Sequence, residues 1–309
     1  MTFTDEISFL VIFFDEIHLL VISFDEVGLL KSIDDKIGFL MISADEVGFL
    51  IISSYEVSLL VISFDEIDLL MISSNEVGIL VISFDEVGLL VISTDEVGFV
   101  VIFSDEVGLL MISFDEISLL VSSDDEIGLL VISLDEINLL MISSDKICFL
   151  MTSADVVGLL IISFDEVDLL ITSVVEVGKM MSSTFVEVSL LIIFSDEIGI
   201  LIISMMSFLM ISADEVGLLM IFSDEISFLM TFADKVDLLM IFADKISFLV
   251  ISSDEVDFLV TSVNEVGLLV ISSNEINLLV ISSDEIDLLM ISSDEVDLLM
   301  TSSNGSAFL

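Results

Sequence analysis

A ten-residue unit repeats along almost the whole chain of 309 residues, and this period limits what the chain can fold into more than any other feature. The copy Val81–Leu90 reads Val-Ile-Ser-Phe-Asp-Glu-Val-Gly-Leu-Leu. We number its residues as positions 1 to 10, so that Val81 is position 1 and the two acids are positions 5 and 6. A period this short is typical of a solenoid or a fibre, in which neighbouring units cover one another, rather than of a globular domain.

The period argues against a long amphipathic helix. At 100° per residue, ten residues turn a helix by about 1000°, so equivalent side chains move about 80° backwards with each copy and no apolar stripe persists. The run Val87–Ile92 is rich in β-branched residues, and the stretch Ser83–Glu86 before it is mostly polar. The unit therefore predicts a strand of about six residues and a corner of about four.

Alternation along the predicted strand contains a conflict. Two-residue periodicity places Val87 and Leu89 on one face, and Gly88 and Leu90 on the other. Position 8, which Gly88 occupies, holds Asp, Ser, Asn or His in other copies and should face water, yet Leu90 shares its face. Either a bulge or corner between Leu89 and Leu90 turns the leucine inward, or the array exposes an apolar stripe and self-associates.

The fold class that follows is all-β, a β-solenoid-like stack of short strands with two or three units per coil. An antiparallel β meander, or no stable fold, is the alternative. The acidic corners oppose stacking, because carboxylates about 4.8 Å apart repel by about 0.9 kcal/mol per pair in bulk water. We therefore expect a folded array to need salt, divalent cations or protonation of some acids.

Two slips in the register of the repeat divide the chain. One residue is gained around Thr184–Glu187, and two are lost across Ser204–Ser207, where the acidic pair is missing. These slips predict three segments. Residues 1–180 and 211–309 are decapeptide repeat arrays, and residues 181–210 hold irregular repeats.

Charge excludes several classes of partner. The chain has 55 acidic residues and 6 lysines, and its formal net charge is -49. Nucleic acid is excluded as a partner, because no cationic surface can neutralise phosphate. A membrane-spanning segment is not expected, because the longest uncharged stretch, Ile198–Ala213, is shorter than the 18 or so apolar residues that a span needs. A single cysteine, Cys148, does not indicate a compartment, so the localisation stays unknown.

The sequence predicts no catalytic, cofactor-binding or metal-binding residue, and no cofactor. Acidic pairs such as Asp65-Glu66 and Asp284-Glu285 lack the spacing of a calcium loop, and we interpret them as solvated corner acids that bind cations loosely at most. His18 is the only histidine, so the many serines have one conceivable base. Cys148 shares position 8 with His18 and is expected to be a passive thiol. The chain is predicted not to be an enzyme.

One local resemblance is to the SUMO-interacting motif, a short Val/Ile-rich core flanked by serine and acids. Leu278–Glu285 reads Leu-Leu-Val-Ile-Ser-Ser-Asp-Glu and is similar to it, as are many other copies. The resemblance implies a strand that adds to the sheet of a protein partner, with avidity from repetition. It covers eight residues per copy and implies nothing about the fold.

Variation between copies bears on function. Position 8 changes among chemically unlike residues whose codons differ by one or two bases, and Lys31 and Lys179 stand at positions that are otherwise apolar. This pattern is typical of a drifting thirty-base repeat, so the sequence has the features of a conceptual translation of a minisatellite. No biochemical activity and no partner can be identified from the residues. The alternative is a structural or binding array that presents apolar-acidic strands to a protein or loosely binds divalent cations, and self-association is expected.

Overall fold

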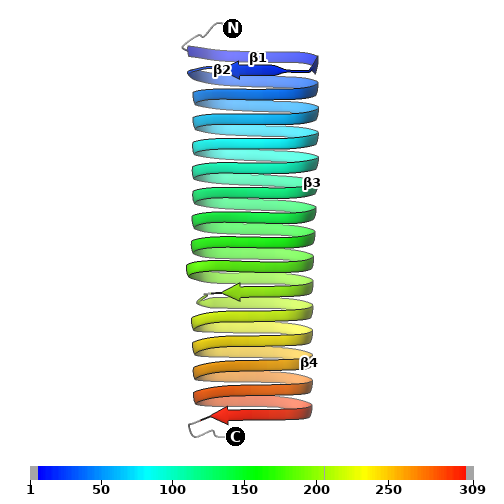
Figure 1. The fold of residues 1–309 in the computed structure, drawn as a ribbon, viewed down its shortest axis with the longest axis vertical. Helices are drawn as coiled ribbons and strands as arrows, with labels where there is room; N and C mark the ends of the chain where they lie inside the picture. The colour runs from blue at the N-terminus through cyan, green and yellow to red at the C-terminus, as the bar shows by residue number, and fades with distance from the viewer. Residues whose placement is uncertain (1–5, 205, 304–309) are drawn as a thin grey trace. The chain divides into compact units, whose positions relative to one another are not determined.

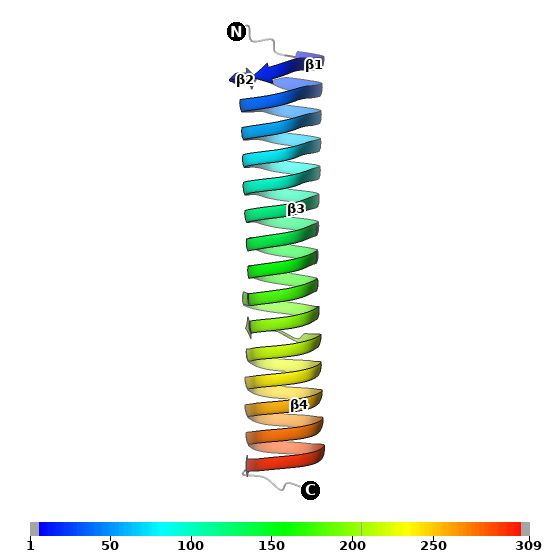
Figure 2. The ribbon, with the colours of Figure 1, turned by 90° about the vertical axis from the view of Figure 1, so that its right-hand side faces the viewer.

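The structure, a computed structural model, describes residues 6–204 and 206–303, and the side chains of these residues apart from 6, 14, 183–188 and 303. Strand covers nearly all of them (Figure 1, Figure 2). The elements are β1 (Glu6–Ile17), β2 (Leu20–Ser23), β3 (Glu26–Ser204) and β4 (Phe208–Ser303). The described residues contain no helix, so the all-β prediction is confirmed.

Parallel pairing between successive coils defines the architecture. β1 pairs with β3 in the register Glu6↔Glu26 and Ile7↔Val27, and β2 pairs with β3 from Leu20↔Leu40 onward. Each partner lies 20 residues along the chain, so one coil contains two ten-residue units. The chain is therefore a β-solenoid at the lower of the two predicted coil sizes, and the parallel direction rules out the antiparallel meander.

Burial shows how one unit forms half a coil. From Leu90 to Thr94 the side chains alternate, with Leu90 and Ile92 fully buried and Val91 partly exposed. The alternation breaks at positions 5 and 6, where two successive acids both face solvent, and again at positions 8 and 9; only position 7 points inward between them. Half a coil is thus a flat segment, which runs from position 10 of one unit to position 4 of the next, followed by an arc of positions 5 to 9. These match the flat sides and rounded ends in Figure 1.

This arrangement resolves the conflict over faces and corrects the strand boundaries. The corner that turns Leu90 inward exists, and it lies at Gly88 and Leu89, which both face outward. Strict two-residue alternation across Val87 is wrong, because Val87 is buried while Leu89 faces outward. The predicted corner also began too early. Phe84 is 3% exposed and belongs to the flat segment, because the pleat continues inward until two adjacent carboxylates require water.

The core is a column of apolar side chains enclosed by the coil. Positions 2, 7 and 10 supply it, chiefly as isoleucine, valine and leucine, and leucines such as Leu40, Leu60 and Leu80 are 0% exposed. Phe64 and Phe84 stack inside it with ring centroids 5.8 Å apart. Each such side chain contributes about 1.5–3 kcal/mol by leaving water, so two or three inward apolar residues in each unit sustain the coil.

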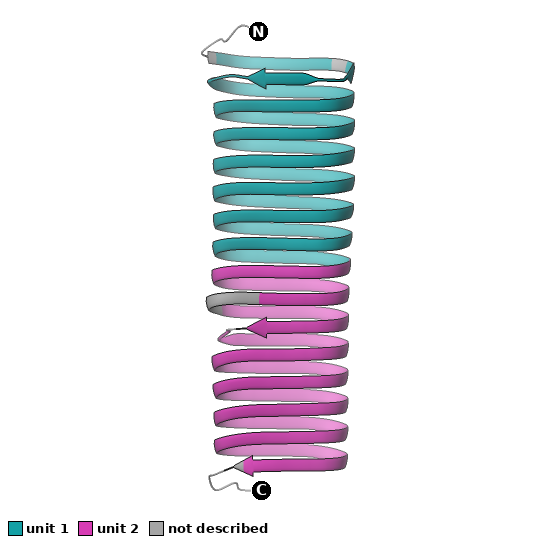
Figure 3. Cartoon of the chain, viewed as in Figure 1, with its two compact units in different colours: residues 1–155 teal, residues 156–309 magenta. Residues whose placement is uncertain are grey.

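The chain forms two compact units, Met1–Asp155 and Val156–Leu309, and each is a solenoid of the same kind (Figure 3). In the second unit the register slips change the coil length. Gly199 lies over Gly178, a step of 21 residues, and Gly217 lies over Gly199, a step of 18. The short coil includes the break between β3 and β4, whereas the first slip falls on residues 183–188, whose side chains are outside the described set. The predicted division at 180 and 210 stays a prediction.

Candidate functional site

The arcs carry the charge of the solenoid. Positions 5 and 6 face solvent in every complete arc with described side chains, and parallel pairing places the same positions of successive coils above one another. Asp85, Asp105 and Asp125, for example, follow one another in one column and are all exposed. Like charges stacked in this way repel. Each arc is therefore an acidic edge whose repulsion opposes the stacking of coils that the apolar core favours.

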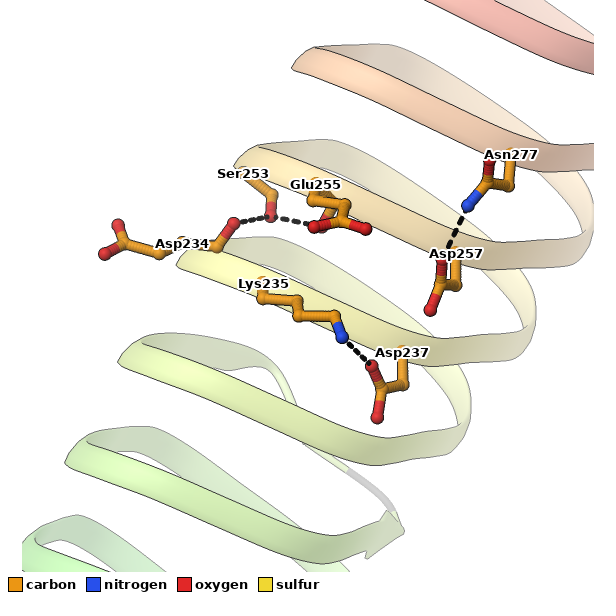
Figure 4. Close-up of polar contacts among 7 residues, drawn as sticks. All are labelled: Asp234, Lys235, Asp237, Ser253, Glu255, Asp257 and Asn277. Carbon is orange, nitrogen blue, oxygen red and sulfur yellow. Dashed lines mark hydrogen bonds and ion pairs between the residues drawn. The ribbon is translucent and has the colours of Figure 1, made fainter.

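Amide side chains interrupt the acidic columns at several coils. Asn264 donates a hydrogen bond of 2.9 Å from Nδ2 to Asp244, and Asn274 donates one of 3.0 Å to Asp254. Asn277, at position 8, donates one of 2.6 Å to Asp257 (Figure 4). Each of these bonds joins residues 20 apart. An asparagine therefore removes one charge from the column and adds a bond between adjacent coils.

Lysines neutralise a few further acids on the arcs. Lys36 lies 2.6 Å from Glu56, and this hydrogen-bonded pair raises the pKa of the lysine. Lys235 lies 3.2 Å from Asp237, which raises its pKa in the same way (Figure 4). Both ammonium groups are solvent-exposed, so these contacts stabilise the coil only slightly.

Serine at position 4 fastens the end of the flat segment to its neighbour. The Ser253 hydroxyl lies 3.1 Å from the carbonyl oxygen of Asp234 in the preceding coil and 2.9 Å from that of Glu255 (Figure 4). Ser273 and Ser283 make the same two contacts. A hydroxyl at this inward position is thus satisfied by backbone oxygens where the arc begins.

A glycine-floored groove follows one acidic edge of the first unit. It encloses about 720 Å³ and is lined by positions 6 to 8 of alternate units, from Glu26 to Cys148. Its floor is mostly glycine at position 8, where adjacent coils approach closely; a Cβ on Gly88 would lie 2.7 Å from the carbonyl oxygen of Asp68. The groove therefore lies where arcs are in close contact, and its position 6 residues are glutamates except for Lys146.

A second groove, in the other unit, combines aromatic and acidic walls. It encloses about 440 Å³ and is lined by Ser204, Phe222, Ser223, Asp224, Phe242, Ala243, Asp244, Ser262 and Asn264. Phe222 and Phe242 occupy position 3 on adjacent coils, and their rings stack with centroids 5.3 Å apart and planes within 7°. Asp224 and Asp244, two residues further along, face the same side of the strand.

Two aspartates lie inside the core of the first unit at position 4. Asp124 is 4% exposed and accepts hydrogen bonds from Ser104 and Ser122, and burial raises the pKa of its carboxyl group despite these donors. Asp34 is also buried and accepts a hydrogen bond from Ser32. In both copies the serine at position 2 replaces the usual isoleucine, so the two polar side chains enter the core together.

The acids, the histidine and the cysteine that the sequence singles out do not come together in one site. Asp65 and Asp284 are exposed acids on arcs. His18 is exposed at position 8, and Cys148 is an exposed free thiol at one end of the glycine-floored groove. Among the described residues no three His, Cys, Asp or Glu side chains are grouped to hold a metal ion. Whether the chain is an enzyme stays untested.

The stretch that resembles a SUMO-interacting motif lies within β4. Leu279 and Ile281 point into the core and are 0% and 2% exposed. The coil is held on both sides, because Ser283 donates to the carbonyl of Asn264 and Ser293 donates to that of Asn274. An interior copy of the motif can therefore pair with another protein only if its coil opens.

Lys31 and Lys179 stand at positions 1 and 9, which face outward. Their side chains are partly or fully exposed, so neither lysine disturbs the core, although other copies carry apolar residues at these positions. Variation at these positions is what a solvent-facing surface tolerates. It therefore adds no support to the interpretation of the repeat as a drifting minisatellite.

Comparison with protein-family models, with curated proteins and with solved structures found no match. The described part of the chain also has no helix with the length and apolar character to cross a membrane.

Sequence reasoning missed the aromatic groove and the buried aspartates. The groove depends on which copies are adjacent, and Phe222 becomes a neighbour of Phe242 only once the coil is known to contain two units. A search for identical residues at a spacing of 20 would have found it. The buried aspartates could also have been found from the sequence. Among the copies with described side chains, both that have aspartate at position 4 also have serine at position 2.

Proposed function

We propose that the chain is a non-enzymatic structural protein whose solenoid extends by end-to-end addition of further copies. The observation that carries the proposal is the uncovered core of the last described coil. Val296 and Leu299 occupy inward positions, yet they are 38% and 44% exposed. Leu279, at the position of Leu299 one coil earlier, is 0% exposed. A parallel strand edge with an open apolar core beside it is a template for another strand.

The first described coil has a matching open side. Leu10 and Ile12 stand at inward positions and are partly exposed, whereas Leu30, one coil further along, is 1% exposed. Phe9 and Phe13 beside them are 63% and 64% exposed. Because the same repeat supplies both coils, each presents its apolar positions in the same order.

The repeat also specifies a register for the contact. Continuing the coil-to-coil pairing places Ile291 opposite Ile12, Val296 opposite Ile17 and Leu299 opposite Leu20 of the next copy. Each of these pairs joins equal positions of the unit, as the pairs within the solenoid do. The two surfaces are different, so the contact is heterologous and leaves a free end after every addition, which produces a filament.

The test is the assembly state of the full chain with a charged last coil. Val296→Lys combined with Leu299→Lys places two ammonium groups on the open core, and we expect the double variant to stay monomeric where the parent forms filaments. Ser292→Lys with Ser302→Lys adds the same charge to exposed side chains of the same coil and should leave assembly unchanged. Sedimentation velocity and electron microscopy measure the result. Equal assembly of all three proteins would refute the end-to-end contact.

A further inference from the structure

The aromatic groove of the second unit has two walls of different chemistry. One is the stack of Phe222 on Phe242, whose rings are 39% and 36% exposed although they are large apolar groups. The other is formed by Asp224 and Asp244, which are exposed on the same side of the sheet. Between the walls lie Ser223 and Ala243 at position 4, the inward position of the flat segment, so no outward side chain separates a ligand from either wall.

Charge favours a cation in this groove. Asn264 continues the acidic wall with an amide that donates to Asp244, so the wall remains anionic at its two aspartates. The net charge of -49 raises the local concentration of any cation near the surface. Phenylalanine faces attract positive charge as well, and the attraction is strongest when the cation is poorly hydrated.

We propose that this groove is a binding site for planar aromatic cations. The ligand lies along the solenoid axis with its ring system against Phe222 and Phe242, and its positive charge beside Asp224 and Asp244. An aromatic cation meets both walls at once, whereas a strongly hydrated metal ion gains little from the rings. The parallel coils hold the two phenylalanines in register before the ligand arrives, so little ordering cost opposes binding.

A matched position in the same unit lacks the ladder. Phe232 is also at position 3, is 39% exposed and has Asp234 two residues further along. Its equivalents one coil away on either side, Ser212 and Ser252, are serines. Phe232 therefore offers one ring where the groove offers two stacked rings, and it is the control for a site that depends on the stack.

The test is a titration of the full chain with thioflavin T, a planar aromatic monocation, followed by fluorescence and calorimetry. All proteins carry Val296→Lys and Leu299→Lys, so that dye sites formed between copies in a filament do not contribute. Dye binding to the groove is thus measured on a single chain, whether or not the parent forms filaments. The variants are Phe222→Ser with Phe242→Ser, and Asp224→Asn with Asp244→Asn. The controls are Phe232→Ser, and Asp234→Asn with Asp254→Asn. Circular dichroism verifies that each variant keeps its β-structure.

We expect loss of the two phenylalanines to weaken dye binding at least about tenfold, because both aromatic contacts disappear. Loss of the two aspartates should weaken it roughly three- to tenfold and reduce its dependence on salt. The controls should bind as the parent does. Parent-like binding by the double phenylalanine variant, or an equal loss in the Phe232→Ser control, would overturn the proposal.

Discussion

Single polar residues inside the coil show how far the core departs from an ideal apolar column. Threonine replaces isoleucine at position 2 in several units, and the hydroxyls of Thr152, Thr172, Thr231 and Thr261 are buried without a hydrogen-bond partner. A buried hydroxyl that has lost water and gained no partner costs about 1–3 kcal/mol. These positions are therefore local weaknesses that the repeated core around them tolerates.

Replacing such a threonine by valine, which has nearly the same shape, should stabilise the coil. We expect Thr231→Val and Thr261→Val each to raise the free energy of unfolding by about 1 kcal/mol, because the unsatisfied hydroxyl is removed. Thr301→Val, made in the Val296→Lys, Leu299→Lys protein that we expect to stay monomeric, is the control, since Thr301 is exposed in the single chain. Chemical denaturation measures the differences. A loss of stability at both buried positions would mean that the hydroxyls have partners in solution.

Asp124 makes the stability of the first unit dependent on pH. Its folded pKa is raised by burial, so between the ordinary value of about 3.9 and the raised value the folded state binds more protons than the unfolded state. Stability therefore falls as the pH rises through this window. We expect Asp124→Asn to unfold less readily than the parent at pH 7, with an advantage that shrinks toward pH 4. Denaturation at a series of pH values tests this, and a difference that stays constant with pH would contradict it.

At the scale of the coil, the acidic arc and the apolar flat segment oppose each other. The flat segments stack with their neighbours through parallel pairing and a shared core, whereas the arcs stack carboxylates in columns. Asn264 and Asn274 relieve this conflict locally, because each donates to the aspartate one coil earlier. The distribution of asparagine at position 5 thus has a physical effect on the stability of the array.

Restoring a charge in a column should destabilise it. We expect Asn274→Asp to lower the free energy of unfolding by roughly 0.5–1 kcal/mol at low salt, because it removes a bond to Asp254 and makes the column of aspartates continuous from Asp254 to Asp294. The loss should shrink when salt is added. Ser282→Asp adds the same charge on a flat side, at a position where the adjacent coils carry serine, and should cost less. An equal cost at both sites would show that stacked charges are not the cause.

The sequence predicted the class of the fold and the existence of a corner, but not the identity of all inward residues. The ten-residue period excluded a helix and indicated a stacked β-structure, and the polarity of position 8 showed that Gly88 faces water. The coil size was open between two and three units, because one unit gives the same local pattern in both. The placement of Phe84 in the core and the neighbours of Phe222 both depend on that choice, so neither could be derived.

Across the whole chain, a net charge of -49 opposes the association of copies that the open coils favour. Repulsion between like-charged chains is long-ranged and screened by salt, whereas burial of an apolar edge acts at contact and depends little on salt. Solution conditions should therefore decide whether ends meet.

Raising salt from about 20 mM to about 500 mM should accelerate filament growth at pH 7, because screening reduces the repulsion. Lowering the pH toward the isoelectric point of about 4.1 should do the same by neutralising carboxylates. Light scattering with electron microscopy measures the rate. Growth that slows under both changes would show that charged contacts, rather than the apolar edge, hold the copies together.

Two ten-residue units form one coil of the solenoid, and the distance between two spin labels tests this coil size. With Cys148→Ser as background, labels are placed on cysteines at Ser73 and Ser93, which are 20 residues apart, or at Ser63 and Ser73, which are ten apart; all three are exposed position 3 residues. If a coil contains two units, the labels of the first pair lie on adjacent coils, close enough for strong dipolar coupling. The labels of the second pair lie on opposite flat sides of the solenoid. We predict strong spectral broadening for Ser73 with Ser93 and little for Ser63 with Ser73. Strong broadening for the pair ten residues apart, or for neither pair, would contradict the coil described above.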